Sequence, residues 1–325
     1  MSILIVGGAG YIGSHTAKRV AAAGQEPIVL DNLVYGHRWA VKWGPFIEGD
    51  LADAALLERV FKAHRIEAVI HFAAFTYVGE SVTNPRKYFR NNLVNALNLL
   101  DAMVDHGVRD IVFSSTCATY GEPTEVPIPE THRQDPVNPY GEAKLAVEKA
   151  LKWYSGAYGL RYAALRYFNA AGASPEAEIG EDHDPETHLI PLAIAAALGG
   201  KGLEIYGTDY PSADGTAIRD YIHVQDLADA HVAALAKLRA GATSLSVNLG
   251  TGRGHSVRQV IAAVEKVSGK KIAVRETGRR AGDPPALVAD ARLAAEVLGW
   301  QARIPGIEAI VAHAWRWRQR KDGRA

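Results

Sequence analysis

The sequence contains a single cysteine, Cys117, among its 325 residues. One cysteine excludes an internal disulfide and offers no set of thiolates for a metal, so we expect no metal site. Charge of one sign is not in excess either, because 36 basic residues balance 36 acidic residues. This balance gives no support for binding nucleic acid or a charged membrane surface.

Long apolar runs are also missing. The longest, "LIPLAIAAALGG" at 189–200, is too short to cross a bilayer, and the opening "MSILIVGGAG" shows no basic leader. We therefore expect a soluble, cytoplasmic protein with no membrane association. The basic C-terminal stretch "RWRQRKDGRA" at 316–325 predicts a solvated, frayed end.

The first half of the chain alternates short apolar runs with segments of helical spacing, as buried parallel strands joined by helices do. The strands are expected at 3–7, 27–31, 45–50, 68–73, 110–115 and 161–168. Residues 1–167 thus predict an α/β domain with a doubly wound parallel sheet, Rossmann-like in type.

The rhythm loosens beyond Phe168, where a Gly, Pro and acid-rich connection occupies 169–188. Connections of this length in compact proteins often form functional loops or begin another subdomain. Short strands are expected at 203–207, 220–224 and 246–250, with helices at 224–238, 256–267 and 307–317. Residues 168–325 are expected to form mainly a smaller, mixed α/β substrate-binding cap, and interleaving with the first domain is left open.

A glycine-rich turn, "GGAGYIG" at 7–13, directly follows the first expected strand. Gly7, Gly10 and Gly13 allow a tight turn, close approach of a pyrophosphate and packing of the next helix, whose N-terminus attracts phosphates. The second strand ends in Asp31, where a carboxylate binds a ribose diol and repels a 2′-phosphate, so NAD is favoured over NADP. An isolated turn of this kind is often only a tight corner, and the combined strand, turn, helix and acid argue against that.

A tyrosine precedes a lysine by four residues in "NPYGEAKLAVEKA" at 138–150. Asn138 suits a helix N-cap and Pro139 the first turn, and residues four apart share a helix face. Tyr140 and Lys144 are therefore expected to stand together, where a lysine ammonium favours the phenolate and makes a proton-transfer pair. Chance produces this pattern in chains of this length, so other motifs must support it.

Hydroxyl side chains gather just upstream, in "FSSTCATYGEP" at 113–123. This stretch is expected to be a strand that runs into a turn of small residues. Because ligands bind at the carboxyl ends of strands in such sheets, we expect these hydroxyls to face the binding crevice.

These motifs together resemble the extended short-chain dehydrogenase/reductase family. Within it, seven ordered stretches are similar to those of UDP-glucose 4-epimerases (UDP-galactose 4-epimerases), and the resemblance runs from Ile3 to about Trp317. The stretches are "GGAGYIGSHT", "VIHFAA", "VGESV", "YGEAKLAVE", "LRYFN", "RDYIHVQDLADAH" and "AGDPPALVAD".

The resemblance implies that Thr116, Tyr140 and Lys144 are catalytic. Tyr140 as phenolate takes the proton of the sugar C4 hydroxyl, Thr116 hydrogen-bonds the same oxygen, and Lys144 holds a ribose hydroxyl and lowers the tyrosine pKa. Lowering a tyrosine pKa from near 10 to about 7 requires roughly 4 kcal/mol. Hydride leaves C4 for NAD and returns to the other face of the 4-keto sugar, so NAD stays bound between turnovers.

The resemblance also implies two sets of binding residues. The cofactor set comprises Gly7, Gly10, Tyr11, Ile12, Gly13, Asp31, Asn32, Asp50, Leu51, Phe72, Ala73, Ala74, Asn91, Tyr140, Lys144 and Phe168. The substrate set, for a UDP sugar, comprises Thr116, Asn169, His188, Leu189, Tyr206, Arg219, Arg280, Asp283 and Leu287. Asp50 ends the third strand and contacts the adenine on this interpretation, although such an acid is often only a helix cap.

Three positions depart from the pattern of some family members. Thr116 replaces a serine and keeps the hydroxyl, Thr76 replaces a lysine near the cofactor, and His188 replaces an asparagine that contacts substrate. The roles of Thr76 and His188 are therefore left open.

Two functions other than epimerisation are disfavoured by the sequence. Nucleotide-sugar 4,6-dehydratases carry an acid pair directly after the catalytic hydroxyl, and Cys117 with Ala118 cannot replace it. A redox-sensing NAD-binding protein without catalysis is disfavoured because the Thr, Tyr and Lys set is complete.

The substrate stays open between a UDP-hexose, UDP-N-acetylglucosamine and a UDP-pentose. In the family, a bulky tyrosine at the position of Leu287 goes with simple hexoses.

Family members commonly form homodimers through a helix like that around 92–104 and the Tyr140 helix, so we expect a homodimer.

Overall fold

The computed structural model describes residues 2–280, 282–304 and 306–323. Its main feature is a seven-stranded parallel sheet in the order β10-β6-β5-β4-β1-β2-β3. The strands are β1 (Ser2–Val6), β2 (Glu26–Asp31), β3 (Phe46–Glu48), β4 (Ile66–His71), β5 (Asp110–Thr116), β6 (Arg161–Tyr167) and β10 (Leu245–Leu249). The order reverses between β1 and β4, which creates the crevice where doubly wound sheets bind ligands. The predicted fold class is therefore confirmed.

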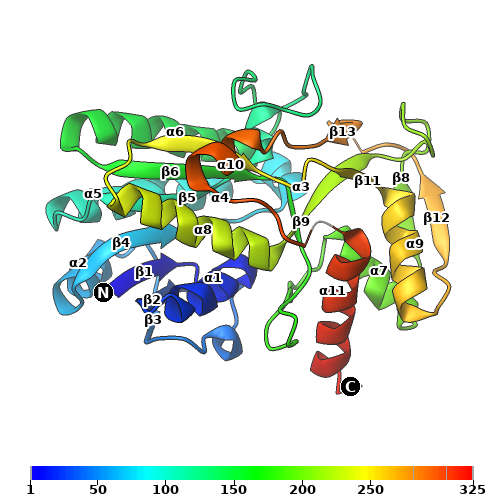
Figure 1. Cartoon of the computed structure of the whole chain (residues 1–325), viewed down its shortest axis with the longest axis horizontal. Coiled ribbons are helices and arrows are strands. Elements are labelled where there is room, and N and C mark those ends of the chain that lie inside the picture. The colour runs from blue at the N-terminus through cyan, green and yellow to red at the C-terminus, as the bar shows by residue number, and fades with distance from the viewer. Residues whose placement is uncertain (1, 281, 305, 324–325) are drawn as a thin grey trace.

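Helices cover both faces of this sheet, which explains why its strands are apolar on both sides (Figure 1). One face carries α1 (Tyr11–Ala22), α8 (Val224–Arg239) and α10 (Arg292–Leu298). The other carries α2 (Ala54–Ala63), α5 (Asn95–Asp105) and α6 (Pro139–Tyr158). Short helical segments lead into α5, namely α3 (Val78–Thr83), α4 (Pro85–Tyr88) and the π-helical η2 (Phe89–Val94). Two 3-10 turns, η1 (Arg38–Ala40) and η3 (Cys117–Tyr120), follow β2 and β5.

A second core lies beside the carboxyl ends of the main strands, where Figure 1 shows α7, α9 and α11 grouped together. It combines α7 (Leu189–Ala197), α9 (Val257–Ser268) and α11 (Ile307–Lys321) with two small sheets. One sheet joins β7 (Asn169–Ala171), β9 (Ile218–His223), β11 (Gly254–Ser256) and β13 (Ala286–Leu287), and the other pairs β8 (Leu203–Tyr206) with β12 (Val274–Thr277).

The two parts interleave. The strand expected at 246–250 is β10, which pairs with β6 at the edge of the main sheet, and α8 and α10 also pack on that sheet. The boundary expected at 167 therefore does not separate the two sheets. Strands β7, β11, β12 and β13 were not predicted, because each has four residues or fewer and carries no alternating pattern.

The C-terminal stretch is not frayed as expected over most of its length. Helix α11 continues to Lys321, and Trp317 is buried with its indole nitrogen 3.1 Å from the main-chain oxygen of Glu181. The sequence prediction was wrong because one apolar face, set among arginines, packs on the 172–188 loop. Residues 324–325 lie outside the described residues.

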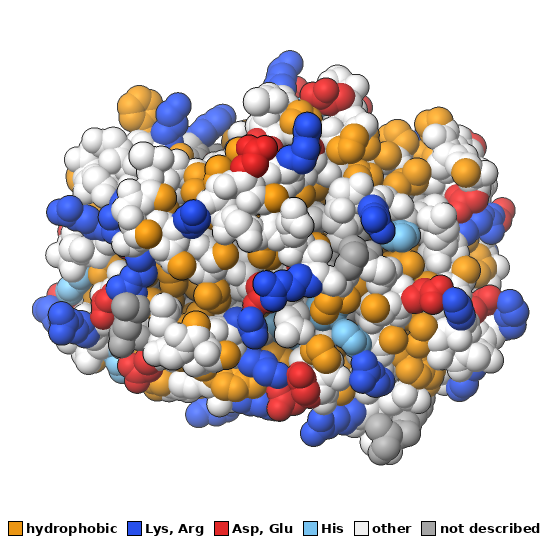
Figure 2. Space-filling model, viewed as in Figure 1, with side chains coloured by type: hydrophobic (Ala, Val, Ile, Leu, Met, Phe, Trp, Pro, Cys, Tyr) orange, Lys and Arg blue, Asp and Glu red, His pale blue; other side chains and the backbone are white. Residues whose placement is uncertain are grey.

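The surface carries both signs of charge. Lys and Arg side chains are interspersed with Asp and Glu over the face shown in Figure 2. Within the described residues, no helix combines the length and the apolarity needed to traverse a bilayer.

Candidate functional site

A cavity of about 430 Å³ lies over the carboxyl ends of the main strands and reaches the second core. Its lining joins residues that are far apart in the sequence, from the glycine turn at 7–13 to Leu287. This is the position at which a doubly wound sheet places its ligand.

The glycine turn forms one end of the cavity. Gly7 has φ +80°, and a Cβ there would lie 2.5 Å from the main-chain nitrogen of Ala73, while a Cβ on Gly13 would lie 2.2 Å from the oxygen of Gly7. Among the residues that the structure describes, no side chain caps the N-terminus of α1 at Gly10, which lines the cavity, so its first-turn N–H groups are available to a ligand. The turn therefore packs closely against the segment that follows β4 and against α1, and it leaves a helix N-terminus open to an anion.

Asp31 ends β2 and lines the same cavity. Its carboxylate accepts hydrogen bonds from the main-chain nitrogens of Ala9 (3.0 Å) and Leu33 (2.8 Å). Burial raises the pKa of Asp31, and those two bonds oppose the rise. The carboxylate is thus held in place at a position where a nucleoside diol would bind.

Thr116 and Tyr140 meet at the middle of the cavity. Thr116 is the last residue of β5, and Tyr140 stands in the first turn of α6, which begins after Asn138 as predicted because the Asn138 side chain accepts from the nitrogen of Gly141. Burial raises the pKa of Tyr140 well above its ordinary value, and a hydrogen bond with Thr116 opposes that rise. Both residues line the cavity and their side chains are within hydrogen-bond reach of one another, so one ligand oxygen can contact both.

Lys144 lies below this pair and is not part of the cavity lining. Its Nζ donates to the main-chain oxygen of Ser114 at 2.8 Å and lies 4.9 Å from the centre of the Phe113 ring. Burial lowers the pKa of Lys144 to about 7. The expectation that Lys144 depresses the tyrosine pKa thus meets an opposing effect, because burial disfavours the charged form of both side chains.

The opposite wall comes from the second part of the chain. Arg219 on β9 pairs with the Asp283 carboxylate and also donates to the main-chain oxygen of Ile218 at 2.7 Å. Asn169 and Leu287 contribute to the same wall. A guanidinium beside a carboxylate can bind a diphosphate and a ribose side by side.

Most of the residues expected to bind cofactor or substrate line this cavity. The lining includes Gly7, Gly10, Tyr11, Ile12, Gly13, Asp31, Asn32, Asp50, Leu51, Phe72, Ala73, Ala74, Asn91, Thr116, Tyr140, Phe168, Asn169, His188, Leu189, Arg219, Asp283 and Leu287, together with Thr76. Asp50 accepts from the Asn32 side chain (2.6 Å) and from the nitrogen of Ala52 (2.8 Å).

Three expected residues lie outside the lining, and one of them is Lys144. The other two, Arg280 and Tyr206, stack on one another with the guanidinium 3.9 Å from the ring centre. Tyr206 also donates to Glu204 at 2.5 Å.

The sequence analysis missed several residues of the lining, among them Tyr35, Tyr77, Glu181 and His183. The signal for the last two is the dense run of acids and histidines in "GEDHDPETH" at 180–188, part of the connection expected to be a functional loop or the start of another subdomain. His188, whose role was left open, is paired with Glu181 at the cavity wall. Burial lowers the pKa of His188, and the Glu181 carboxylate outweighs that effect and raises it.

Comparison with known proteins gives a consistent result. The model of the NAD dependent epimerase/dehydratase family matches residues 3–250. A UDP-glucose 4-epimerase of Lacticaseibacillus casei is 51% identical over 321 residues, covering 98% of this chain and 97% of that protein. The crystal structure of UDP-glucose 4-epimerase from Brucella ovis in complex with NAD is 52% identical, with a TM-score of 0.95 and 97% of each chain covered. The UDP-Glc/GlcNAc 4-epimerase from Campylobacter jejuni is 42% identical, with a TM-score of 0.86 and coverage of 98% of this chain and 99% of that one.

Proposed function

The chain belongs to the NAD dependent epimerase/dehydratase family, and we propose that it interconverts UDP-glucose and UDP-galactose by inverting the configuration at C4 of the sugar. One observation carries the assignment of roles: the glycine turn, Asp31, Thr116 and Tyr140 line a single cavity with Arg219 on its far wall.

The cofactor is NAD, and the cavity fits it. Gly7 and Gly13 keep the turn flat against the sheet, the uncapped N-terminus of α1 receives the pyrophosphate, and Asp31 receives the adenosine ribose. When bound, NAD⁺ supplies a hydride acceptor and a positive charge beside Tyr140. That charge favours the phenolate, which burial alone disfavours.

Tyr140 acts as the acid and base of the reaction. Its phenolate takes the proton of the C4 hydroxyl, and its phenol gives that proton back when the 4-hydroxyl is restored. Bound NAD⁺ would accept the C4 hydride and return it to the other face of the sugar. Thr116 hydrogen-bonds the same sugar oxygen and orients it. Lys144 would hold a ribose hydroxyl of NAD with an N–H that it does not donate to the oxygen of Ser114.

The far wall holds the rest of the substrate. Arg219 neutralises the diphosphate, Asp283 binds the uridine ribose, and Asn169 contacts a phosphate oxygen. Leu287 flanks the sugar. On this assignment Arg280, which stacks on Tyr206, also serves the diphosphate.

A second substrate is favoured by one side chain. Leu287 is half-buried on the two-residue strand β13 and offers less bulk than a tyrosine. We therefore propose additional, weaker turnover of UDP-N-acetylglucosamine, with UDP-galactose and UDP-glucose preferred.

The two parts of the chain have different roles in this proposal. Residues 1–167 carry the cofactor and catalytic side chains, and 168–325 supply mainly the substrate wall.

We also propose that the protein acts in the cytoplasm as a homodimer that pairs through η2, α5 and α6. Support comes from large apolar side chains exposed there, since Trp153 on α6 is 78% exposed and Phe89 38%. Light scattering should give the mass of a dimer for the wild type and of a monomer for Trp153→Glu.

An assay of the purified protein tests the function directly. Turnover is measured on UDP-glucose, UDP-galactose, their N-acetyl analogues and UDP-pentoses, and the bound cofactor is identified after denaturation. We expect NAD at about one per chain and fastest turnover of the simple hexoses. Absence of turnover on every UDP sugar, with NAD bound, would refute the proposal.

A further inference from the structure

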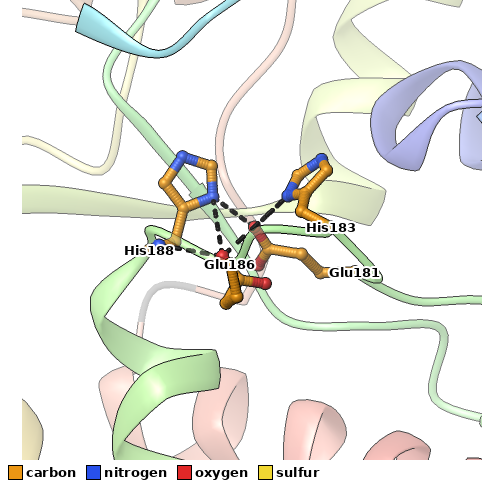
Figure 3. A group of neighbouring side chains, drawn as sticks. All are labelled: Glu181, His183, Glu186 and His188. Atoms are coloured by element: carbon orange, nitrogen blue, oxygen red, sulfur yellow. Dashed lines mark hydrogen bonds and ion pairs between the residues drawn. The ribbon is translucent and has the colours of Figure 1, made fainter. Parts of the chain in front are cut away.

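Four metal-ligand side chains meet in the loop between β7 and α7. They are Glu181, His183, Glu186 and His188, and one ligand atom of each lies within 4.8 Å of those of the other three. In Figure 3 both imidazole rings turn their Nδ1 atoms inward toward the two carboxylates. The cluster is distinct in composition from the catalytic hydroxyls, and the proposed reaction makes no use of it.

The distances suit a small cation. Nδ1 of His183 lies 3.2 Å from Oε1 of Glu181 and 4.0 Å from Oε1 of Glu186. Nδ1 of His188 lies 3.9 Å from Oε1 of Glu186 and is in contact with Oε1 of Glu181. In a tetrahedral zinc site with bonds of about 2.0–2.2 Å, neighbouring ligand atoms are roughly 3.3 Å apart. The His183–Glu181, His183–Glu186 and His188–Glu186 separations are thus close to those of such a site, and the His188–Glu181 contact would lengthen when a metal binds.

The charge of the cluster also calls for a cation. The Glu181 side chain is only 5% exposed and that of Glu186 only 20%. Within the part of the chain that the structure describes, neither carboxylate forms an ion pair with a lysine or arginine, and their ion-pair partners are the two imidazoles of the same cluster. Nδ1 of His183 is buried and makes no hydrogen bond there. Buried carboxylates are normally paired with a cation or coordinate a metal.

The loop is fastened around the cluster from three sides. Trp317 donates to the main-chain oxygen of Glu181 (3.1 Å), Tyr77 donates to that of Pro185 (2.6 Å), and the His37 ring bonds that of Asp182 (2.6 Å). The main-chain nitrogens of Thr187 (2.7 Å) and His188 (2.8 Å) orient the Glu186 carboxylate. Such support pre-orders the side chains before any ligand binds.

We propose that Glu181, His183, Glu186 and His188 bind one divalent transition metal ion, zinc by ligand type, which fastens the 172–188 loop against the cavity. Two imidazoles with two carboxylates favour zinc over calcium or magnesium, which take oxygen ligands. Four protein ligands make a closed, structural site rather than a catalytic one. The expectation from the sequence that no metal site exists considered thiolates alone and overlooked this set.

Metal titration of the full, untagged chain tests the site. The protein is stripped with a chelator, and Zn²⁺, Mn²⁺, Ca²⁺ and Mg²⁺ are titrated by calorimetry, with bound metal counted by mass spectrometry. We expect one Zn²⁺ per chain and a Tm increase of about 5 °C or more in saturating Zn²⁺. Ca²⁺ and Mg²⁺ should have no comparable effect.

Variants locate the binding. His183→Ala and the nearly isosteric Glu186→Gln should each weaken Zn²⁺ at least about tenfold. His106→Ala is the matched control, because His106 pairs with Glu58 at 2.7 Å on the surface, far along the chain from the loop. It should bind Zn²⁺ like the wild type. Failure of the wild type to take up Zn²⁺ overturns the proposal even where a variant does not fold, and so does undiminished uptake by a folded His183→Ala and Glu186→Gln. Activity is not the readout, so this result is independent of the epimerase assay.

Discussion

The amine of Lys144 donates to the main-chain oxygen of Ser114 at 2.8 Å, which places a lysine charge beneath the cavity floor with 3% of the residue exposed. A buried lysine charge is costly, and burial accordingly lowers its pKa to about 7. The residue is therefore kept at a cost in stability, as expected where a side chain serves a ligand and not the fold.

Lys144→Met should make the stability of the protein less dependent on pH. Below about pH 7 the buried amine is charged in both states and its burial penalty is complete. Between about pH 7 and the unfolded value near 10.4 the folded protein loses its proton first, so wild-type stability rises with pH. We expect the variant to have the higher Tm at pH 6 and the gap to shrink toward pH 9.5. Calorimetry measures this, with exposed Lys149→Met on the same helix as control, and a gap independent of pH would contradict it.

Tyr140→Phe should lower kcat at least about 100-fold while NAD stays bound, because the ring still packs but no proton acceptor remains. Tyr154→Phe is a matched control, since Tyr154 stands on the same helix and donates to Asp101 at 2.5 Å outside the cavity. Steady-state rates and the cofactor content decide between them. More than about a tenth of the wild-type rate in Tyr140→Phe would contradict acid and base catalysis by this residue.

Asp31→Asn should weaken NAD binding much more than NADP binding. The substitution removes the charge that binds the ribose diol and repels a 2′-phosphate. Its single amide oxygen can accept from only one of the nitrogens of Ala9 and Leu33, which bond different oxygens of Asp31, so loosening of the turn affects both cofactors alike while the lost charge changes their ratio. The affinities for NAD and NADP are measured on protein freed of nucleotide. Comparing the two cofactors within one protein controls for any general loss of binding. Equal weakening of both cofactors would leave Asp31 a purely structural role.

Leu287→Tyr should depress turnover of UDP-N-acetylglucosamine at least about tenfold and leave that of UDP-galactose within a few-fold, since the bulk of one side chain is worth about 1–3 kcal/mol in discrimination. The ratio of kcat/KM for the two substrates is the measurement, with Leu287→Met as a size-matched control. Equal harm to both substrates, or a wild type inert toward the N-acetyl sugar, would refute the role of Leu287.

The pair Arg166 and Glu148 should show strong coupling in stability. Both side chains are 7% exposed and 2.7 Å apart, and Ser115 donates to the same glutamate at 2.5 Å. Glu148→Ala alone should cost about 3–5 kcal/mol, because it leaves a buried guanidinium unpaired. The double variant Glu148→Leu with Arg166→Met should lose less than that single variant, as measured by urea unfolding. If the loss of unfolding free energy in the double variant equalled the sum of the losses from the two single substitutions, that result would argue against a buried pair.

Periodicity predicted the strands and the main helices because burial on both faces leaves long apolar runs, as in β5, where all seven residues are buried. Capping predicted the start of α6 through Asn138. Periodicity could not predict which sheet a strand joins. The sequence of β10 is like that of any short strand, and its place beside β6 depends on the packing of distant elements.

In the site, too, local motifs could be predicted from the sequence and contacts between distant residues could not. Motifs with fixed spacing, such as the glycine turn and Tyr140 with Thr116, were placed in the cavity from sequence alone. Two features of the site could not be predicted from the sequence: the stacking of Arg280 on Tyr206 and the burial of the Lys144 amine. They depend on side-chain rotamers and on desolvation, which a sequence motif does not specify. The inward turn of four side chains from the 172–188 loop required three distant anchors, including Trp317.

The edge strand β10 and the helices α8 and α10 come from beyond residue 167, yet they complete the main sheet. Grafting the whole of 168–325 from a relative would therefore replace one side of the nucleotide-binding scaffold along with the sugar pocket. A chimera meant to transfer sugar preference should instead exchange 168–223 together with 250–291 and retain 224–249. Because the pocket walls are encoded in such separated stretches, new preferences in this chain are reached more readily by point changes than by swapping a contiguous module.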